Sequence, residues 1–141
     1  MGKHILKLEL DYDFELIGIS THLKIHKLAW LLNKELNLNF TRLENHSLRK
    51  KGLESDSEFA KFQFDDEINR SVYTLLENKG INGLLVPELK NIDFFMLISG
   101  LAVINMADNF TNDIMQLEGV SSSMKLNIEN LKSKNNLFIE T

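Results

Sequence analysis

Apolar and polar residues alternate near the start of the chain with the two-residue period of a half-buried strand. Leucines at positions 6, 8 and 10 are separated by Lys7 and Glu9, and an extended apolar pattern resumes from Phe14 to Ile19. Asp11 to Asp13 interrupt the two stretches. The pattern therefore predicts either one long bulged strand or two short strands over residues 6–19.

The period changes to that of a helix between Leu23 and Leu36. Five apolar residues fall on one side of such a helix: Ile25, Leu28, Ala29, Leu32 and Leu36. Ser20 or Thr21 is available as the N-cap. Trp30 lies roughly opposite the apolar stripe, so its ring either packs on a second layer or is presented to a partner.

The middle of the chain predicts a hairpin. A short strand over residues 40–43 is followed by a polar segment, residues 44–58, which we expect to be an exposed loop. Residues 59–64 and 72–77 then alternate between apolar and polar side chains, and the intervening DDEINR carries turn chemistry.

The stretch GLLVPELKNIDFFMLI, residues 83–98, follows a turn at residues 78–83. Pro87 cannot donate a backbone hydrogen bond, so we expect it to start or interrupt a sheet strand. Residues 92–98 are nearly all apolar and suit a strand that is covered on both faces.

A second amphipathic helix is predicted over residues 101–117, with Gly119 as its C-cap. Its apolar stripe consists of Val103, Met106, Ala107, Phe110, Ile114 and Leu117. We interpret the serines at 121–123 as a polar turn, followed by short final strands at 124–128 and 137–139. No repeat or linker divides the chain.

This order of elements predicts a single α+β domain over residues 1–141. Two helices with one apolar stripe each are most simply placed on one face of a mostly antiparallel sheet. We expect a ferredoxin-like or related α/β sandwich.

Composition narrows the class of protein. Hydrophobic residues make up 43% of the 141 residues and charged residues 26%, which is ordinary for a folded domain. The chain has no cysteine, so disulfides and thiolate metal sites are excluded. The first residues lack the pattern of a secretory signal and no apolar run is long enough to span a bilayer, so we expect a cytoplasmic protein without a membrane contact.

The residues Val86-Pro87-Glu88 and, after three further positions, Ile92-Asp93-Phe94 resemble the signature of the IPExxxVDY family, with conservative replacements at three positions. LDYDFELIGIS near the start, the tryptophan-bearing helix and LKSKNNLF near the end resemble the same family. The resemblance implies a bacterial protein and supplies no catalytic assignment, because the family is a group of unknown function.

Glu88 and Asp93 are the candidate acid and base, since two carboxylates in different environments can take different pKa values. An enzyme should also show an activating base, a phosphate loop or a metal cluster, and the sequence shows none of these. We therefore expect these carboxylates to hold an irregular connection in place by accepting backbone N–H bonds, and Asp93 in particular to be tied to nearby backbone.

Histidines and glycines add no recognisable site. His22 and His26 have the i, i+4 spacing of a metal pair but lack the HExxH pattern, so we expect solvent-edge histidines and no metal or other cofactor. Gly80, Gly83 and Gly100 form neither GxGxxG nor a P-loop.

Net charge is −4, and the only basic run is Arg49, Lys50 and Lys51, which together with Arg42 forms a candidate positive patch. The leading hypothesis is a non-enzymatic binding or adaptor module, with a protein partner or a second copy bound through a sheet edge. The alternative is an RNA-associated or RNA-processing accessory factor that uses this patch, and the third is a small-molecule-sensing domain. Trp30, Phe94, Phe95 and the aromatic residues of 59–64 could form a base-stacking platform, but core packing is the expected role of these aromatic residues.

Overall fold

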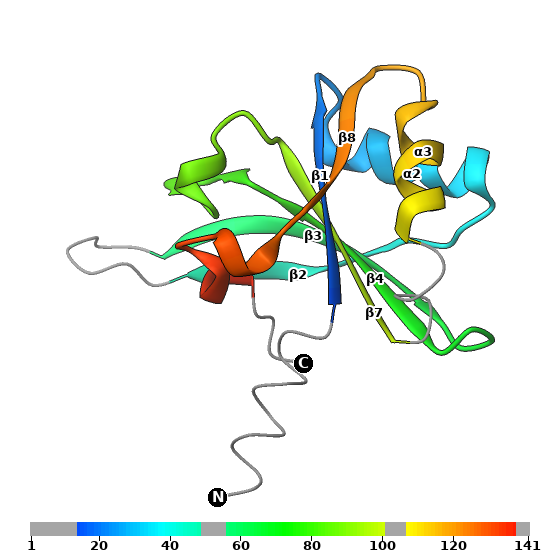
Figure 1. The fold of residues 1–141 in the computed structure, drawn as a ribbon, viewed down its shortest axis with the longest axis horizontal. Coiled ribbons are helices and arrows are strands. Elements are labelled where there is room, and N and C mark those ends of the chain that lie inside the picture. The colour runs from blue at the N-terminus through cyan, green and yellow to red at the C-terminus, as the bar shows by residue number, and fades with distance from the viewer. Residues whose placement is uncertain (1–13, 49–55, 101–106, 138–141) are drawn as a thin grey trace, which may run out of the picture.

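The computed structural model describes residues 14–48, 56–100 and 107–137. A six-stranded sheet with the order β2-β3-β4-β7-β1-β8 forms the body of this part of the chain (Figure 1). Its strands are β1 (Phe14–Thr21), β2 (Thr41–Leu48), β3 (Ser57–Asp66), β4 (Ser71–Glu77), β7 (Phe94–Gly100) and β8 (Val120–Leu126). The helices are α2 (Ile25–Leu36) and α3 (Ala107–Met115), and a small hairpin consists of β5 (Lys79–Gly80) and β6 (Gly83–Leu84).

All neighbouring strands of the large sheet are antiparallel. β1 lies between β7 and β8, the strands that precede and follow α3, which is the split arrangement of a β-α-β-β-α-β fold. Between the two helices, however, the chain forms a four-stranded meander, β2-β3-β4-β7. The predicted α+β class is confirmed. The fold is related to the ferredoxin-like arrangement by the position of β1 and differs from it in this longer meander.

Both helices cover the same face of the sheet, as predicted. One core cluster joins the buried stripe of α2 and the buried residues of α3 to alternate residues of β1, β4 and β7. From the helices it includes Ile25, Leu28, Ala29, Leu32, Phe110 and Ile114. In Figure 1 the two helices lie together on one side of the sheet.

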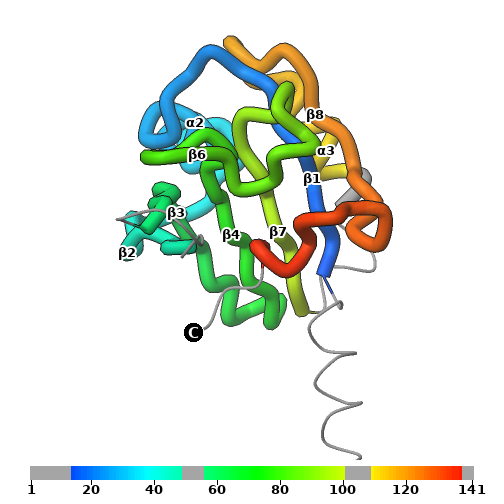
Figure 2. Tube along the Cα trace, turned by 90° about the vertical axis from the view of Figure 1, so that its left-hand side faces the viewer, coloured from blue at the N-terminus to red at the C-terminus, as the bar shows by residue number. Residues whose placement is uncertain are grey.

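The opposite face has no α-helix among the described residues and carries a second core cluster. Strand residues Leu16, Phe59, Leu76, Phe95 and Leu97 contribute one side of it. The other side comes from the chain between β4 and β7 and from the segment after β8, which supply Leu85, Val86, Ile92, Ile128, Leu131 and Leu137. Figure 2 looks onto this face and shows both segments lying in front of the sheet. We call it the helix-free face.

Central strands are buried on both sides because of these two layers. β7 has five consecutive buried residues, Phe94 to Ile98, which confirms the predicted strand covered on both faces. The predicted hairpin is also confirmed, with β3 and β4 paired from Lys61 opposite Leu76 to Asp66 opposite Ser71. Phe59, Phe94 and Phe95 are buried, so these aromatic residues pack in the core as expected.

Several boundaries differ from the predictions. The N-cap of α2 is Lys24, without a side-chain cap, and Ser20 and Thr21 belong to β1. The α3 helix ends at Met115, so Gly119, although its φ of 97° is left-handed, lies in the turn before β8 and does not cap the helix. The early part of this predicted helix and the predicted strand at 6–10 fall outside the described residues.

The predicted loop over 44–58 is wrong at both ends. β2 continues to Leu48 and β3 begins at Ser57, while residues 49–55 lie outside the described chain. β2 is polar because it is an edge strand whose first four side chains are exposed, so backbone pairing and not apolar patterning defines it.

The serines at 121–123 are also part of a strand, β8, and not of a turn. At the end of the described chain, Lys134–Leu137 forms a 3-10 helix, and the remainder of the strand predicted at 137–139 lies outside the described residues. No helix in the described part of the chain is long and apolar enough to cross a bilayer.

Candidate functional site

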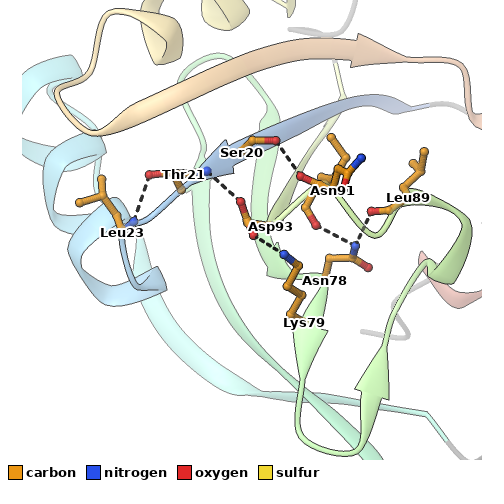
Figure 3. A network of polar contacts seen from close by, with 9 residues as sticks. Ser20, Thr21, Leu23, Asn78, Lys79, Leu89, Asn91 and Asp93 are labelled. Carbon is orange, nitrogen blue, oxygen red and sulfur yellow. Dashed lines mark hydrogen bonds and ion pairs between the residues drawn. The ribbon is translucent and has the colours of Figure 1, made fainter.

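The segment that connects β4 to β7 contains the motif residues and is held by a network of polar contacts (Figure 3). The segment forms the β5–β6 hairpin, turns at Pro87 into a 3-10 helix, η1 (Pro87–Leu89), and returns to the sheet at Phe94. Pro87 thus occupies the first position of a 3-10 helix. The prediction that it starts or interrupts a sheet strand is wrong; its fixed φ and missing N–H suit the first turn of a helix equally well.

Asn78 is at the centre of this network and is completely buried. Its side-chain Nδ2 donates to the carbonyl oxygens of Leu89 at 2.9 Å and Ile92 at 2.8 Å, and its Oδ1 accepts from the Val86 N–H at 2.7 Å. These backbone groups belong to an irregular segment and have no sheet partner there. The Asn78 amide therefore replaces the hydrogen bonds that regular structure would supply.

The Asn78 backbone closes the base of the same segment. Its N–H donates to the Asp93 carbonyl at 3.0 Å, and its carbonyl accepts from the Leu85 N–H at 2.7 Å. Gly80 lies against the start of β3, where an added Cβ would be only 2.1 Å from the Glu58 carbonyl oxygen. Gly80 thus has a packing role, which explains a glycine that belongs to no phosphate-binding motif.

Asp93 ties the return of the segment to the end of β1. Its Oδ2 accepts from the Thr21 N–H at 2.9 Å, its Oδ1 lies 2.8 Å from Lys79 Nζ, and its own N–H donates to the Ile19 carbonyl. The predicted hydrogen bond between Asp93 and backbone is confirmed. The backbone group is nearby in space but belongs to the other end of the sequence.

The contacts continue from Thr21 into the turn before α2. The Thr21 hydroxyl donates to the Gly119 carbonyl at 2.6 Å and accepts from the Leu23 N–H at 3.1 Å. The Ser20 hydroxyl donates to the Asn91 carbonyl at 2.9 Å. One continuous set of hydrogen bonds therefore joins the motif segment, the end of β1 and the start of β8.

Glu88 binds a different part of the molecule, the chain after β8. Its Oε2 accepts from the Ser133 N–H at 2.7 Å and its Oε1 from the Ser133 hydroxyl at 2.8 Å. Desolvation raises the pKa of Glu88, but hydrogen bonds from the backbone of Glu88 and Lys132 and from Ser133 outweigh it, so the pKa lies below its ordinary value. The carboxylate form is therefore the one that holds Ser133.

Asn136 and His46 extend the attachment of the same C-terminal segment. Asn136 Nδ2 donates to the Leu85 carbonyl at 2.8 Å, and His46 Nε2 lies 2.8 Å from the Asn136 carbonyl, which can only accept. Burial lowers the pKa of His46, the Asn136 carbonyl opposes this, and the positive charge of Lys61 lowers the pKa further.

The two motif carboxylates do not share a binding partner. Glu88 holds Ser133, whereas Asp93 holds Thr21 and Lys79. The oxygens of both carboxylates already accept hydrogen bonds or an ion pair from these residues, so each carboxylate holds its own partners in place. The geometry is that of two structural ties between separate parts of the fold.

The remaining motif residues pack in the core. Val86 and Ile92 are buried in the helix-free face, and Phe94 is buried under the helices. In residues 14–48, 56–100 and 107–137, no group of three or more acidic or histidine side chains could hold a metal ion, and His22 and His26 are both exposed.

Among the described interaction residues, Trp30 does not pack in the core, and it lies on a different element from Arg42. Trp30 is 49% exposed on α2, while the Arg42 guanidinium on β2 donates to the carbonyls of Leu43 and Lys61 and to the Asn45 side chain. Arg49, Lys50 and Lys51 lie outside the described residues. The RNA-binding patch thus stays a prediction, with Arg42 already bound to its own strand and the neighbouring one.

The two edges of the large sheet are β2 and β8, which lie at opposite margins in Figure 2. β2 has a register irregularity between Leu43 and His46 and carries Arg42 over its carbonyls. β8 has its only irregularity at its start, opposite Ser20 and Thr21, and residues 120–124 carry no charge.

A surface cleft of about 430 Å³ adjoins the end of β8. Phe14, Leu126 and Ile128 supply its apolar lining, and Glu15 and Lys125 line it as well, with Lys125 Nζ 3.8 Å from the Glu15 carboxylate. Met124, the neighbouring side chain of β8, is 48% exposed. A cleft with both apolar and charged lining thus lies next to an edge strand that pairs on one side only among the described strands.

Sequence reasoning missed Asn78, Thr21, Ser133 and Asn136. Each is a polar residue next to a predicted strand or inside a predicted loop, where polar residues are common. The available signal was the position of Asn78, directly between the apolar strand 72–77 and an irregular segment that needs hydrogen-bond partners.

Comparison with protein-family models and with curated proteins finds no match for this chain. The resemblance to the IPExxxVDY family therefore stays a prediction.

Proposed function

We propose that the protein is a non-enzymatic binding module that associates through the β8 edge of its sheet, with a second copy of the same chain as the occupant. The observation that carries the proposal is the contrast between the edges. β8 is uncharged from Val120 to Met124 and its one register shift lies at its start, between Val120 and Ser122, whereas β2 is interrupted in its middle and carries Arg42. Unpaired edge strands are templates for strand addition unless bulges or charges protect them.

A symmetric antiparallel pair of β8 strands places no two charged side chains directly opposite each other. With the two-fold axis at Ser123, the small Ser121 side chain faces Lys125 of the copy, and Met124 faces Ser122. Like charges do not face each other in this register. The backbone pairing would continue the sheet into the second copy, and the exposed Met124 side chains would be partly covered.

The experiment is sedimentation velocity together with hydrogen–deuterium exchange over a range of protein concentrations. We expect weight-average mass to rise with concentration and the β8 amides to become more protected in parallel, while the β2 amides do not change. Met124→Lys should weaken association at least about tenfold, because it would place an ammonium group from each copy on the same face of the paired strands, at neighbouring diagonal positions. Leu43→Lys, an exposed position on β2, is the matched control and should have no effect.

A chain that stays monomeric at every concentration, with unchanged β8 protection, would overturn the β8 pairing. Association that Leu43→Lys abolishes and Met124→Lys does not would assign it to the other edge.

The non-enzymatic part of the proposal is supported by the separate structural contacts of Glu88 and Asp93. A turnover screen tests it with Glu88→Gln and Asp93→Asn. Robust activity that is lost in both variants, while both remain folded, would show that the carboxylates act on a substrate.

A further inference from the structure

The solvent-facing side of α2 carries an exposed tryptophan between two lysines. Lys27 Nζ lies 4.3 Å and Lys34 Nζ 4.8 Å from the Trp30 ring centroid. The three residues follow the spacing i, i+3, i+7, so they form one stripe along the helix, opposite the buried stripe. We call these three residues the α2 stripe.

The α2 stripe is positive on a protein that is negative overall. Lys24, at the N-cap, is exposed near the same helix, whereas the whole chain has a net charge of −4. Cation–π contacts at exposed sites are weak, so the lysines can leave the ring to bind a stronger partner. The stripe thus combines an apolar surface with two cations that can be recruited.

We propose that the α2 stripe binds an acidic amphipathic helix of a different protein. Residues spaced by three and then four positions match the contact ridge of a second helix packed alongside. An apolar side chain of that helix would cover Trp30, and carboxylates about one turn before and after it would pair with Lys27 and Lys34. Charge complementarity sets the sign of the partner, and the tryptophan supplies its central contact.

Two other occupants fit the stripe less well. Single-stranded nucleic acid binds by stacking successive bases on several aromatic faces along a basic groove, whereas the α2 stripe has one ring on a helix surface of a chain with a net charge of −4. A second copy of α2 would bring like charges together. The α2 stripe is also on a different element from β8, so it does not depend on the proposed strand pairing.

Trp30 is the only tryptophan of the chain, so its fluorescence reports directly on the stripe. The probe is a synthetic helical peptide with leucine at the central contact position and glutamates one turn to either side. We expect a saturable blue shift of the emission that weakens with salt, and no shift with the same peptide carrying lysine in place of glutamate. An oligouridylate and phosphatidylserine vesicles are the comparison ligands.

Charge reversal tests the contact in the full chain. Lys27→Glu combined with Lys34→Glu should weaken peptide binding at least about tenfold. Arg70→Glu combined with Lys90→Glu makes the same change in net charge at two exposed positions elsewhere and should leave binding within about twofold. Calorimetry with Trp30→Ala should show the loss of the apolar contact, and Met124→Lys should bind the peptide normally.

The proposal is overturned if the acidic peptide causes no shift up to about 1 mM. It is equally overturned if RNA or vesicles bind more tightly than the peptide, which would assign the stripe to those ligands. A similar loss in both charge-reversed pairs would show that only net charge matters.

Discussion

The two faces of the sheet are covered by different kinds of chain, and they depend on different kinds of interaction. Two amphipathic helices cover one face with apolar stripes. The helix-free face is covered by 3-10 turns, by the short β5–β6 hairpin and by connecting segments. These segments also bury leucines, isoleucines and a valine against the sheet. This second layer is held by several side-chain amides and carboxylates that bind backbone groups, whereas on the helix-covered face Asn33 of α2 binds the backbone of Phe40 in this way.

The difference follows from the hydrogen-bonding needs of the backbone. A helix satisfies its own N–H and C=O groups between its ends, so a covering helix needs mainly apolar contacts with the sheet. An irregular segment does not, and its buried backbone groups must find side-chain partners. The covering of the helix-free face is therefore specified by a few individual residues, with Asn78 foremost.

The largest expected effect tests Asn78 directly. Asn78→Ala should reduce the free energy of unfolding by about 2–5 kcal/mol, because the buried Val86 N–H and Ile92 carbonyl would each lose a partner at roughly 1–3 kcal/mol. The Leu89 carbonyl would keep its bond from the Ile92 N–H. Urea denaturation measures the change. A loss below about 1 kcal/mol would mean that water or rearranged backbone satisfies these groups equally well.

Leu28→Ala is the matched substitution on the helix-covered face, since Leu28 is also completely buried. It should cost a similar amount, about 2–5 kcal/mol, by leaving a cavity. Hydrogen exchange should separate the two variants: Asn78→Ala should open residues 79–93 before global unfolding, while Leu28→Ala should not expose this segment selectively. If residues 79–93 open equally in both variants, the two faces do not depend on different kinds of interaction.

Asp93 gives a smaller and more detailed test of how the segment is tied. Asp93→Ala should destabilise by about 1–3 kcal/mol, because the Thr21 N–H loses its acceptor. Asp93→Asn keeps an acceptor oxygen and loses only the ion pair with the half-exposed Lys79, so it should cost under about 1 kcal/mol, as should Lys79→Ala. Thermal and urea unfolding of the three variants give the comparison. Equal losses in Asp93→Ala and Asp93→Asn would assign the stabilisation to the charge instead of the hydrogen bond.

The smallest effect concerns pH and Glu88. Because hydrogen bonding lowers the folded-state pKa of Glu88, its contribution to stability is present above the unfolded-state pKa of about 4.5 and is lost as pH falls through the lower folded-state value. Between about pH 6 and pH 3, the wild type should lose at most about 1 kcal/mol more than Glu88→Gln, since the side chain is exposed. Glu67→Gln, in the β3–β4 turn, is the control and should follow the wild type.

The sequence predicted the helix-covered face better than the helix-free face, for the same physical reason. Periodicity located α2 and the β3–β4 hairpin, and a nearly unbroken apolar run located the doubly covered β7, because apolar packing leaves a pattern along the chain. It failed at β2 and at the serines of β8, which are edge strands defined by backbone pairing with few buried side chains. The long meander between the helices followed from the element order only in outline.

The candidate site was predicted in kind but not in detail. Pro87, Glu88 and Asp93 stood out in the sequence, and hydrogen bonding of Asp93 to backbone was expected. Their partners could not be identified, because Thr21 and Ser133 are distant in sequence and become neighbours only when β1 and the segment after β8 meet the motif. The spacing of polar residues along the sequence does not indicate which distant residue each one will bind.

The pairing of Glu77 with Phe94, followed by the bond from the Asn78 N–H to the Asp93 carbonyl, has a consequence for how this protein can vary. The chain leaves the sheet and comes back at adjacent points, so residues 79–92 form a closed excursion whose length does not set the spacing of β4 and β7. Insertions or deletions within it would leave the strand register intact and change what shields Leu16, Leu76 and Phe95 from water, together with the contacts of Glu88 and Asn91. The sheet can therefore stay constant while the segment 79–92 that covers it changes in length and sequence.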